Sequence, residues 1–245
     1  MVMSPSSSDY KKSTYLAKLP DLLARIHAGL IVSCQAEEGE PLHGRIFMAA
    51  MAFSAAKAGA VGIRANGSED IAAIRRFVNL PIIGISKQDI PGYDVRITPT
   101  LESAIELPAS GADIIALDAT VRPHPHGLSL ADYIHLVHEE TGCPVMADIS
   151  TFDEGLAAEQ SGADLVSTTL SGYTDYSPFQ EAPDLELVRL LASILKIPVI
   201  AEGPIATPDQ AAEALALGAF AVTVGSAITR PQWITARFVH RMSHP

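Results

Sequence analysis

The sequence is poor in cysteine and in positive charge. Its 245 residues include only two cysteines, Cys34 and Cys143, whose separation fits no metal site. Both lie in apolar runs, which indicates buried thiols. Lysine and arginine together number 17, against 28 aspartates and glutamates, and the formal net charge is −11. Because so acidic a chain repels nucleic acids and anionic lipid surfaces, we expect neither as a partner.

Long uncharged runs and a dinucleotide-binding motif are also missing. Even the uncharged stretch from Ala214 to Ile228 is shorter than the roughly 18–20 residues of a membrane span. The first residues, MVMSPSSSDYKKS, are polar where a signal peptide would be apolar, so we expect a cytoplasmic protein. No GxGxxG motif occurs, which weakens the alternative of a doubly wound open sheet that binds a dinucleotide.

What the sequence does contain is a repeated unit. An alanine-rich helical pattern is followed by Gly-Ala and a short apolar strand, and each glycine fits a left-handed helix C-cap. The unit occurs four times, with its glycine at Gly59, Gly111, Gly162 and Gly218. Three further apolar strands each begin with proline, a residue suited to the first position of a strand. Together with GLIVSCQ, from Gly29, they make eight strands.

The eight strands predict the fold. They start near residues 29, 60, 81, 113, 144, 164, 198 and 220, and most of the gaps carry a helical pattern. Continuous apolar strands indicate a sheet that is covered on both faces. Eight β-α units in a chain of this length predict an α/β protein, a single-domain (β/α)8 TIM barrel. We assign residues 13–245 to the barrel and expect residues 1–12 to form a disordered tail.

Three local predictions complete the fold. The segment YLAKLPDLLARIHAG is expected to form a helix that closes the bottom of the barrel. The long stretch after the third strand predicts a short extra strand at Val95–Thr98 and a helix that starts near Thr100. The stretch RPHPHG, with His124 and His126, indicates a loop or lid at the rim. Since no third ligand is evident beside these histidines, we expect no metal site.

Charged residues end several strands, and in this fold the active site lies there. PIIGISK ends in Lys87, and the strand in PVIAEGP is followed by Glu202. A lysine enclosed by apolar strands favours the neutral amine, which can form a Schiff base or remove a proton beside a carbonyl. The structural alternative is an ion pair with Asp118, Asp148 or Glu202. With Glu202 as proton donor on the opposite face, the pair suits epimerisation.

A phosphate site is predicted after strands seven and eight. Gly203 and Gly225 allow backbone N–H groups to approach an anion closely. Ser226 can donate a hydrogen bond, and Arg230 can offer a fork of N–H groups. Either glycine alone is more simply an ordinary turn residue, but the two together, with a nearby arginine, favour phosphate.

Eight motifs, in order, resemble the N-acetylmannosamine-6-phosphate 2-epimerase family over about Leu19 to Phe238. They are GLIVSCQA, GAVGIRANG, PIIGISK, ADIIALDAT, PVMADIST, STTLSGYT, VIAEGPI and AVTVGSAITRP. The resemblance implies a phosphate-binding (β/α)8 isomerase of sialic acid and amino sugar breakdown. It would interconvert N-acetylmannosamine 6-phosphate and N-acetylglucosamine 6-phosphate by inverting C2. It also implies a homodimer that needs no metal, nucleotide or other cofactor.

The resemblance implies residue roles as well. Lys87 matches the catalytic lysine and Glu202 the catalytic carboxylate, so that one removes the C2 proton and the other returns a proton to the opposite face. The remaining matches fall into two groups. The sugar is expected to contact Gln35, Arg64, Asp148 and Thr169, and the phosphate to contact Gly203, Gly225, Ser226 and Arg230.

Two other functions use the same residues. In the first, Lys87 forms a Schiff base in an aldolase-like lyase that acts on a sugar phosphate, and borohydride would trap the adduct. In the second, the protein is a catalytically silent sugar-phosphate sensor, which would bind tightly without turnover. The presence of both Lys87 and Glu202 argues against the sensor, because binding alone needs no acid/base pair.

Overall fold

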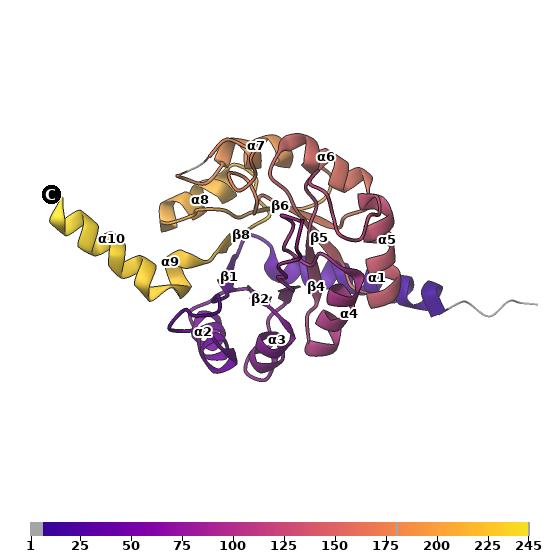
Figure 1. Ribbon diagram of the computed structural model, residues 1–245, viewed down its shortest axis with the longest axis horizontal. Helices are drawn as coiled ribbons and strands as arrows, with labels where there is room; N and C mark the ends of the chain where they lie inside the picture. The colour runs from indigo at the N-terminus through magenta and orange to yellow at the C-terminus, as the bar shows by residue number, and fades with distance from the viewer. Residues whose placement is uncertain (1–6, 180, 245) are drawn as a thin grey trace, which may run out of the picture.

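Eight parallel strands close into a barrel in the computed structural model, which describes residues 7–179 and 181–244 (Figure 1). Each strand pairs with its neighbours in chain order, and β8 pairs with β1. The strands are β1 Leu30–Cys34, β2 Gly62–Asn66, β3 Ile82–Ile85, β4 Ile114–Asp118, β5 Val145–Asp148, β6 Leu165–Ser167, β7 Val199–Ala201 and β8 Ala221–Val224. Every strand begins within two residues of its predicted start, so the single-domain (β/α)8 barrel is confirmed.

Helices α2 to α8 connect successive strands and surround the barrel (Figure 1). The helices are α1 Ser7–Ile26, α2 Arg45–Lys57, α3 Ser68–Arg75, α4 Leu101–Ser110, α5 Leu130–Thr141, α6 Phe152–Gln160, α7 Leu185–Ile194, α8 Pro208–Ala216, α9 Ser226–Thr229 and α10 Pro231–Ser243. Thr100 caps α4 in a capping box, which confirms the predicted helix start. The four repeat glycines all have φ between 91° and 107°, so the predicted left-handed helix ends are confirmed.

Helix α1 closes the end of the barrel where the strands begin. Its Leu22 and Ile26 belong to the apolar cluster that fills the barrel, together with Ile31, Ile83 and Leu165. The N–H of Ala28, just after the helix, donates to the carbonyl of Phe220 at 2.7 Å and ties this end to β8. The predicted closing helix is therefore confirmed, and the interior of the barrel is a packed core rather than a channel.

Two other local predictions need correction. Val95–Thr98 is no strand: Ile97 makes one isolated antiparallel bridge with Lys87, and two backbone hydrogen bonds hold the segment against the end of β3. Helix α1 begins at Ser7, so residues 7–12, which the sequence predicted to be disordered, are helical. Residues 1–6 lie outside the described residues. The stretch with His124 and His126 is a loop between β4 and α5, as predicted.

Both cysteine side chains are buried and free, as their apolar surroundings predicted. Burial raises the pKa of Cys34 to about 12 and that of Cys143 to about 11, so neither thiol ionises near neutral pH. Within the described part of the chain, no helix combines the length and apolar character that crossing a bilayer requires.

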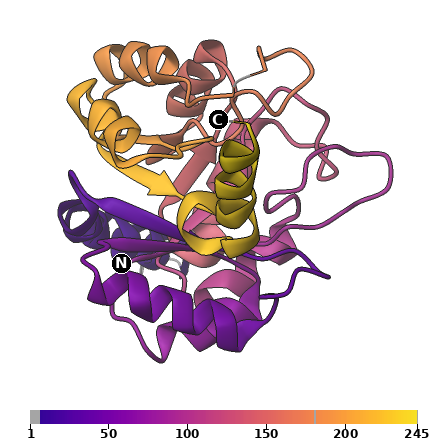
Figure 2. The same cartoon turned by 90° about the vertical axis from the view of Figure 1, so that its left-hand side faces the viewer.

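The C-terminal helix α10 does not cover the barrel. It continues from α9, extends away from the sheet (Figure 1), stands in front of the barrel in the turned view (Figure 2), and has no buried side chain. Three of its large apolar side chains are exposed by 57% to 78%, namely Phe238, Val239 and Met242. Isolated exposed apolar residues are ordinary, but a helix that exposes three of them within five positions presents an unpartnered face.

Candidate active site

A cavity of about 560 Å³ opens at the carboxyl ends of the strands. Nine of the ten site residues predicted from the sequence line it: Gln35, Arg64, Lys87, Thr169, Glu202, Gly203, Gly225, Ser226 and Arg230. The tenth, Asp148, is fully buried behind Arg64 and is not part of the lining. The barrel therefore brings together residues that are up to 195 positions apart in the chain (Gln35 to Arg230, 230 − 35).

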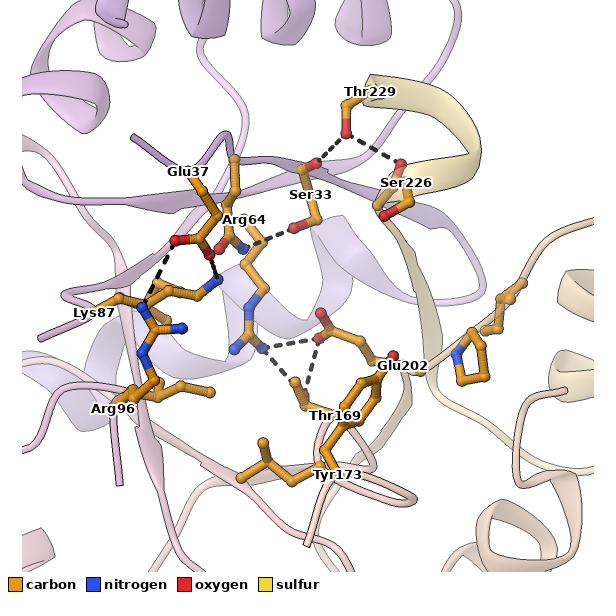
Figure 3. A pocket seen from close by; sticks show the side chains of 18 of the residues that line it. Ser33, Glu37, Arg64, Lys87, Arg96, Thr169, Tyr173, Glu202, Ser226 and Thr229 are labelled. Atoms are coloured by element: carbon orange, nitrogen blue, oxygen red, sulfur yellow. Dashed lines mark hydrogen bonds and ion pairs between the residues drawn. The ribbon is translucent and has the colours of Figure 1, made fainter. Parts of the chain in front are cut away.

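One side of the cavity is a buried polar network around Arg64 (Figure 3). The Arg64 guanidinium donates to both carboxylate oxygens of Asp148, at 3.0 and 2.5 Å, and to Oε2 of Glu202 at 2.8 Å. The Thr169 hydroxyl lies 2.7 Å from Asp148 Oδ1 and 3.1 Å from Glu202 Oε2. Arg64 is the third residue of β2, Asp148 is the last residue of β5, and Glu202 directly follows β7, so the parallel strands bring the three charged groups together.

The charges of this network shift each other's protonation. Burial opposes the charge on Arg64, but Asp148 and Glu202 outweigh it and raise the pKa of the guanidinium. Burial also raises the pKa of Glu202, against the lowering effect of Arg64, and Asp148 adds to the rise. The raised pKa favours the protonated form of Glu202, and this side chain lines the cavity.

Lys87 lies on the other side of the cavity (Figure 3). Its backbone N–H donates to the side-chain oxygen of Asn66 at 2.8 Å, and its Nζ donates to Oε1 of Glu37 at 3.1 Å. The alternative of an ion pair with Asp118, Asp148 or Glu202 is wrong, because the partner is Glu37, on the loop after β1.

The three carboxylates considered earlier are engaged elsewhere. Asp118 pairs with Arg122 at 2.6 Å and accepts a hydrogen bond from the Thr120 hydroxyl at 2.6 Å. Asp148 and Glu202 belong to the Arg64 network described above. Lys87 is also less enclosed than its apolar strand predicted, since 24% of its side chain is exposed.

The predicted phosphate end lies where β7 and β8 finish. Gly203 has φ of 144°, a conformation that residues with a Cβ rarely adopt, so the backbone there requires glycine. Ser226 begins α9, and the first N–H groups of a helix have no acceptor within the helix. Arg230 lines the same end and pairs with Glu40 at 3.3 Å, on the loop that also carries Glu37.

Several lining residues were not predicted from the sequence. Ser33, Glu37, Arg96, Thr229 and Trp233 face the cavity from β1, from loops and from the last two helices. Only the acidic run after Gln35 gave a signal, since three glutamates within four residues of a loop at a strand's carboxyl end are available to meet cations. Arg96 and Trp233 lie on segments whose course depends on tertiary packing.

Comparison with known proteins agrees over most of the chain. Residues 48–244 match the model of the family described as "Putative N-acetylmannosamine-6-phosphate epimerase". A protein of Caldanaerobacter subterraneus subsp. tengcongensis, named "Putative N-acetylmannosamine-6-phosphate 2-epimerase", is 53% identical over 89% of this chain and 93% of its own length.

Two solved structures support the family and the fold, respectively. The N-acetylmannosamine-6-phosphate 2-epimerase of Clostridium perfringens is 47% identical, covers 90% of this chain and 96% of its own, and superposes with a TM-score of 0.87. Thiamine phosphate pyrophosphorylase of Pyrococcus furiosus, 18% identical, covers 91% of this chain and all of its own with a TM-score of 0.58, and shares the fold alone. The chain belongs to the N-acetylmannosamine-6-phosphate 2-epimerase family.

Proposed function

We propose that Lys87 and Glu202 invert C2 of N-acetylmannosamine 6-phosphate by moving protons on opposite faces of the sugar. The 2-epimerase activity itself, and with it a place in amino sugar metabolism, follows from membership of the family. The observation that carries the residue roles is the position of the two groups: they flank one cavity, with the Arg64 guanidinium between them (Figure 3). The product of such an inversion is N-acetylglucosamine 6-phosphate.

The first proton transfer requires an acidic C2–H. In the open-chain aldehyde, C2 lies next to the carbonyl, so loss of its proton gives an enolate whose charge spreads onto oxygen. The C2–H bond breaks and an N–H bond forms on Lys87. In the reverse direction, the Lys87 ammonium returns the proton to the face from which it came. A positioned base of this kind contributes about 10²–10⁴ in rate.

The second proton transfer belongs to Glu202. Burial raises the pKa of this carboxyl, which favours the protonated form that a donor needs. Its O–H bond breaks as a C2–H bond forms on the other face. Asp148 has a different role in this scheme: being fully buried, it holds Arg64 in place, and Arg64 is the group that faces the sugar oxygens.

The phosphate is proposed to bind at the end formed by Gly203, Gly225, Ser226 and Arg230. Backbone N–H groups after β7 and β8, together with the Arg230 guanidinium, suit a dianion. When the substrate enters, the Arg230 guanidinium leaves Glu40 for the phosphate or binds both groups together. Binding energy from this remote group holds C2 between the two proton-transferring side chains.

We also propose that the protein is a homodimer in which the second copy covers α10. The support is the unpartnered apolar face of Phe238, Val239 and Met242, and the exposed Ile46 and Phe47 on α2. Light scattering after gel filtration tests this. The wild type should have twice the mass of one chain. A double variant, Phe238→Ser with Met242→Ser, should shift toward the mass of a single chain. A wild-type monomer at all concentrations contradicts the proposal. The cytoplasmic location stays a prediction.

Proton NMR in heavy water tests the chemistry. With N-acetylmannosamine 6-phosphate, the wild type should form N-acetylglucosamine 6-phosphate that carries deuterium at C2, and Lys87→Ala and Glu202→Ala should each abolish turnover. If the product kept the original C2 proton in full, proton removal by one residue and return by another on the opposite face would be contradicted. Borohydride trapping of Lys87 would favour the Schiff-base lyase instead. Tight binding without turnover by the wild type would favour the sensor.

A further inference from the structure

Glu37 makes a contact that the proposed mechanism leaves without a role. It lies on the loop between β1 and α2, two residues after Gln35, and its Oε1 accepts a hydrogen bond from Lys87 Nζ at 3.1 Å. Both side chains line the cavity, although 43% of Glu37 is exposed. An exposed ion pair contributes little to stability, so we expect its effect in the position of the Lys87 amine.

The backbone of Lys87 is already fixed, but its side chain is not. The N–H of Lys87 is held by Asn66, and the isolated bridge to Ile97 holds the same residue from the other side. Beyond Cα, a lysine has four rotatable bonds and a compact charge without directional preference. Among the described residues, Glu37 is the carboxylate that the structure places on Nζ. Without it, the amine would sample several positions around the cavity.

Glu37 is itself held in place from the outer side. The Arg96 guanidinium lies 3.7 Å from Glu37 Oε2 and is oriented by Asp89, which it contacts at 2.5 and 3.1 Å. The four groups therefore form a charge chain, Asp89–Arg96–Glu37–Lys87, that leads from the exposed rim to the cavity. Hydrogen bonding from Lys87 and its charge, with smaller effects of Arg96 and Arg230, lower the pKa of Glu37, so it stays a carboxylate.

We propose that Glu37 is a positioning residue, which holds the Lys87 amine toward C2 of the sugar and stabilises the ammonium that forms when the C2 proton arrives. This inference rests on the proposed role of Lys87 in the proton transfer. The carboxylate makes no bond to the substrate in this scheme and acts only through Nζ. Because a misplacement of about 1 Å can cost about 100-fold in rate, the effect should appear in kcat rather than in substrate binding.

Three substitutions separate the charge of Glu37 from its reach. Glu37→Gln keeps the length of the side chain but loses the charge, Glu37→Asp keeps the charge but loses one methylene of reach, and Glu37→Ala loses both. We expect kcat to fall about 10-fold for Gln and for Asp and about 10–100-fold for Ala, with KM within about threefold of the wild type. Deuterium exchange at C2, followed by NMR, should fall in proportion to kcat.

Glu38→Gln is the matched control. It removes the same charge one residue along the same loop from an exposed side chain, and we expect wild-type kcat and KM. Thermal unfolding of every variant should stay close to that of the wild type, which separates a catalytic effect from a folding defect. An Arg96→Gln variant should show a smaller fall in kcat, and combining it with Glu37→Ala should add nothing, since both act on one carboxylate.

The outcome distinguishes this inference from the proposal beneath it. If the three Glu37 variants keep wild-type kcat while Lys87→Ala is inactive, the positioning role is wrong and the role of Lys87 stands. If their KM rises while kcat is unchanged, Glu37 binds substrate and does not position Lys87. If Lys87→Ala retains C2 exchange, the proposed mechanism itself fails, whatever the Glu37 variants do.

Discussion

The two sides of the cavity are built on different physical principles. On one side, Arg64 lies on β2, and Asp148 and Glu202 lie where β5 and β7 end. All three are largely buried, and the two carboxylates both accept hydrogen bonds from the Arg64 guanidinium. On the other side, Lys87 pairs with Glu37, and Glu37 pairs in turn with Arg96. Both partners lie on loops and are partly exposed. The first side is fixed by the barrel itself, whereas the second is fixed by one chain of ion pairs.

This difference assigns each side a task. A buried network cannot rearrange cheaply, because separating its charges leaves an unpaired ion in a dry environment. It therefore suits a group such as Glu202, whose protonation must be held away from its ordinary value. A partly exposed lysine can exchange protons with water and move slightly as the sugar enters. The comparison predicts that substitutions on the two sides differ in kind as well as in size.

The largest expected effect is on turnover, when either proton-transferring group is removed. Glu202→Gln keeps the size of the side chain but cannot donate or accept the proton, so we expect kcat to fall about 10²–10⁴-fold. NMR of the sugar phosphates measures it. Lys87→Met, which keeps the apolar stem, should fall within the same range. A Glu202→Gln enzyme within tenfold of the wild type would show that the buried carboxyl is no acid/base group.

The next effect is on stability and separates the two sides directly. Asp148→Ala leaves the buried Arg64 with only Glu202 as counter-charge, and breaking a buried pair costs about 3–5 kcal/mol. Glu37→Ala breaks the ion pair with Lys87, in which the Glu37 side chain is 43% exposed. The free energy of unfolding should therefore fall by no more than about 1 kcal/mol. Urea unfolding of both variants measures the contrast. Equal losses would mean that the burial of the Arg64 network carries no special cost.

The smallest effect is the pH dependence of stability, whose sign differs between two glutamates. The pKa of Glu37 is lowered in the folded chain by Lys87, so its stabilising contribution is present above the unfolded value and is lost as pH falls through the folded one. The pKa of Glu202 is raised by burial, so the folded chain loses stability from this group as pH rises through the window between the two values.

Unfolding free energies of the wild type and of each Gln variant, measured from about pH 3 to pH 8, test these signs. The advantage of the wild type over Glu37→Gln should shrink on acidification, by less than about 1 kcal/mol because the pair is partly exposed. The difference between the wild type and Glu202→Gln should change in the opposite direction. If the difference in unfolding free energy between the wild type and each Gln variant changed with pH in the same direction for both, the opposite pKa shifts of Glu37 and Glu202 would be contradicted.

The fold was predictable because its signals are local. Each Gly-Ala unit marks the end of a helix and the start of a strand within a few residues, and the left-handed glycines repeat that signal four times. Once eight strands are counted, the barrel follows, and with it the convergence of Lys87, Arg64 and Glu202 at one end. Nine lining residues were found in this way because strand ends need no knowledge of the loops.

The loops account for what the sequence did not reveal. Glu37 was not recognised as the partner of Lys87, because its position depends on how the loop after β1 turns back over the cavity. Val95–Thr98 alternates as a strand does, but its pairing with the end of β3 amounts to one isolated bridge, between Ile97 and Lys87. Asp148 was assigned to the sugar by the family resemblance, whereas the packed structure buries its side chain against Arg64 and leaves it outside the cavity lining.

Helix α1 determines from which end of the barrel substrate and product reach the cavity. Because it covers the opposite end and packed side chains fill the barrel interior, the described residues leave no passage through the barrel, and the cavity opens at the carboxyl ends of the strands. Substrate and product, which differ only at one carbon, must use the same opening and the same anion site. Each sugar phosphate is then a competitive inhibitor of the reaction of the other, and net flux depends on how fast the next step removes the product.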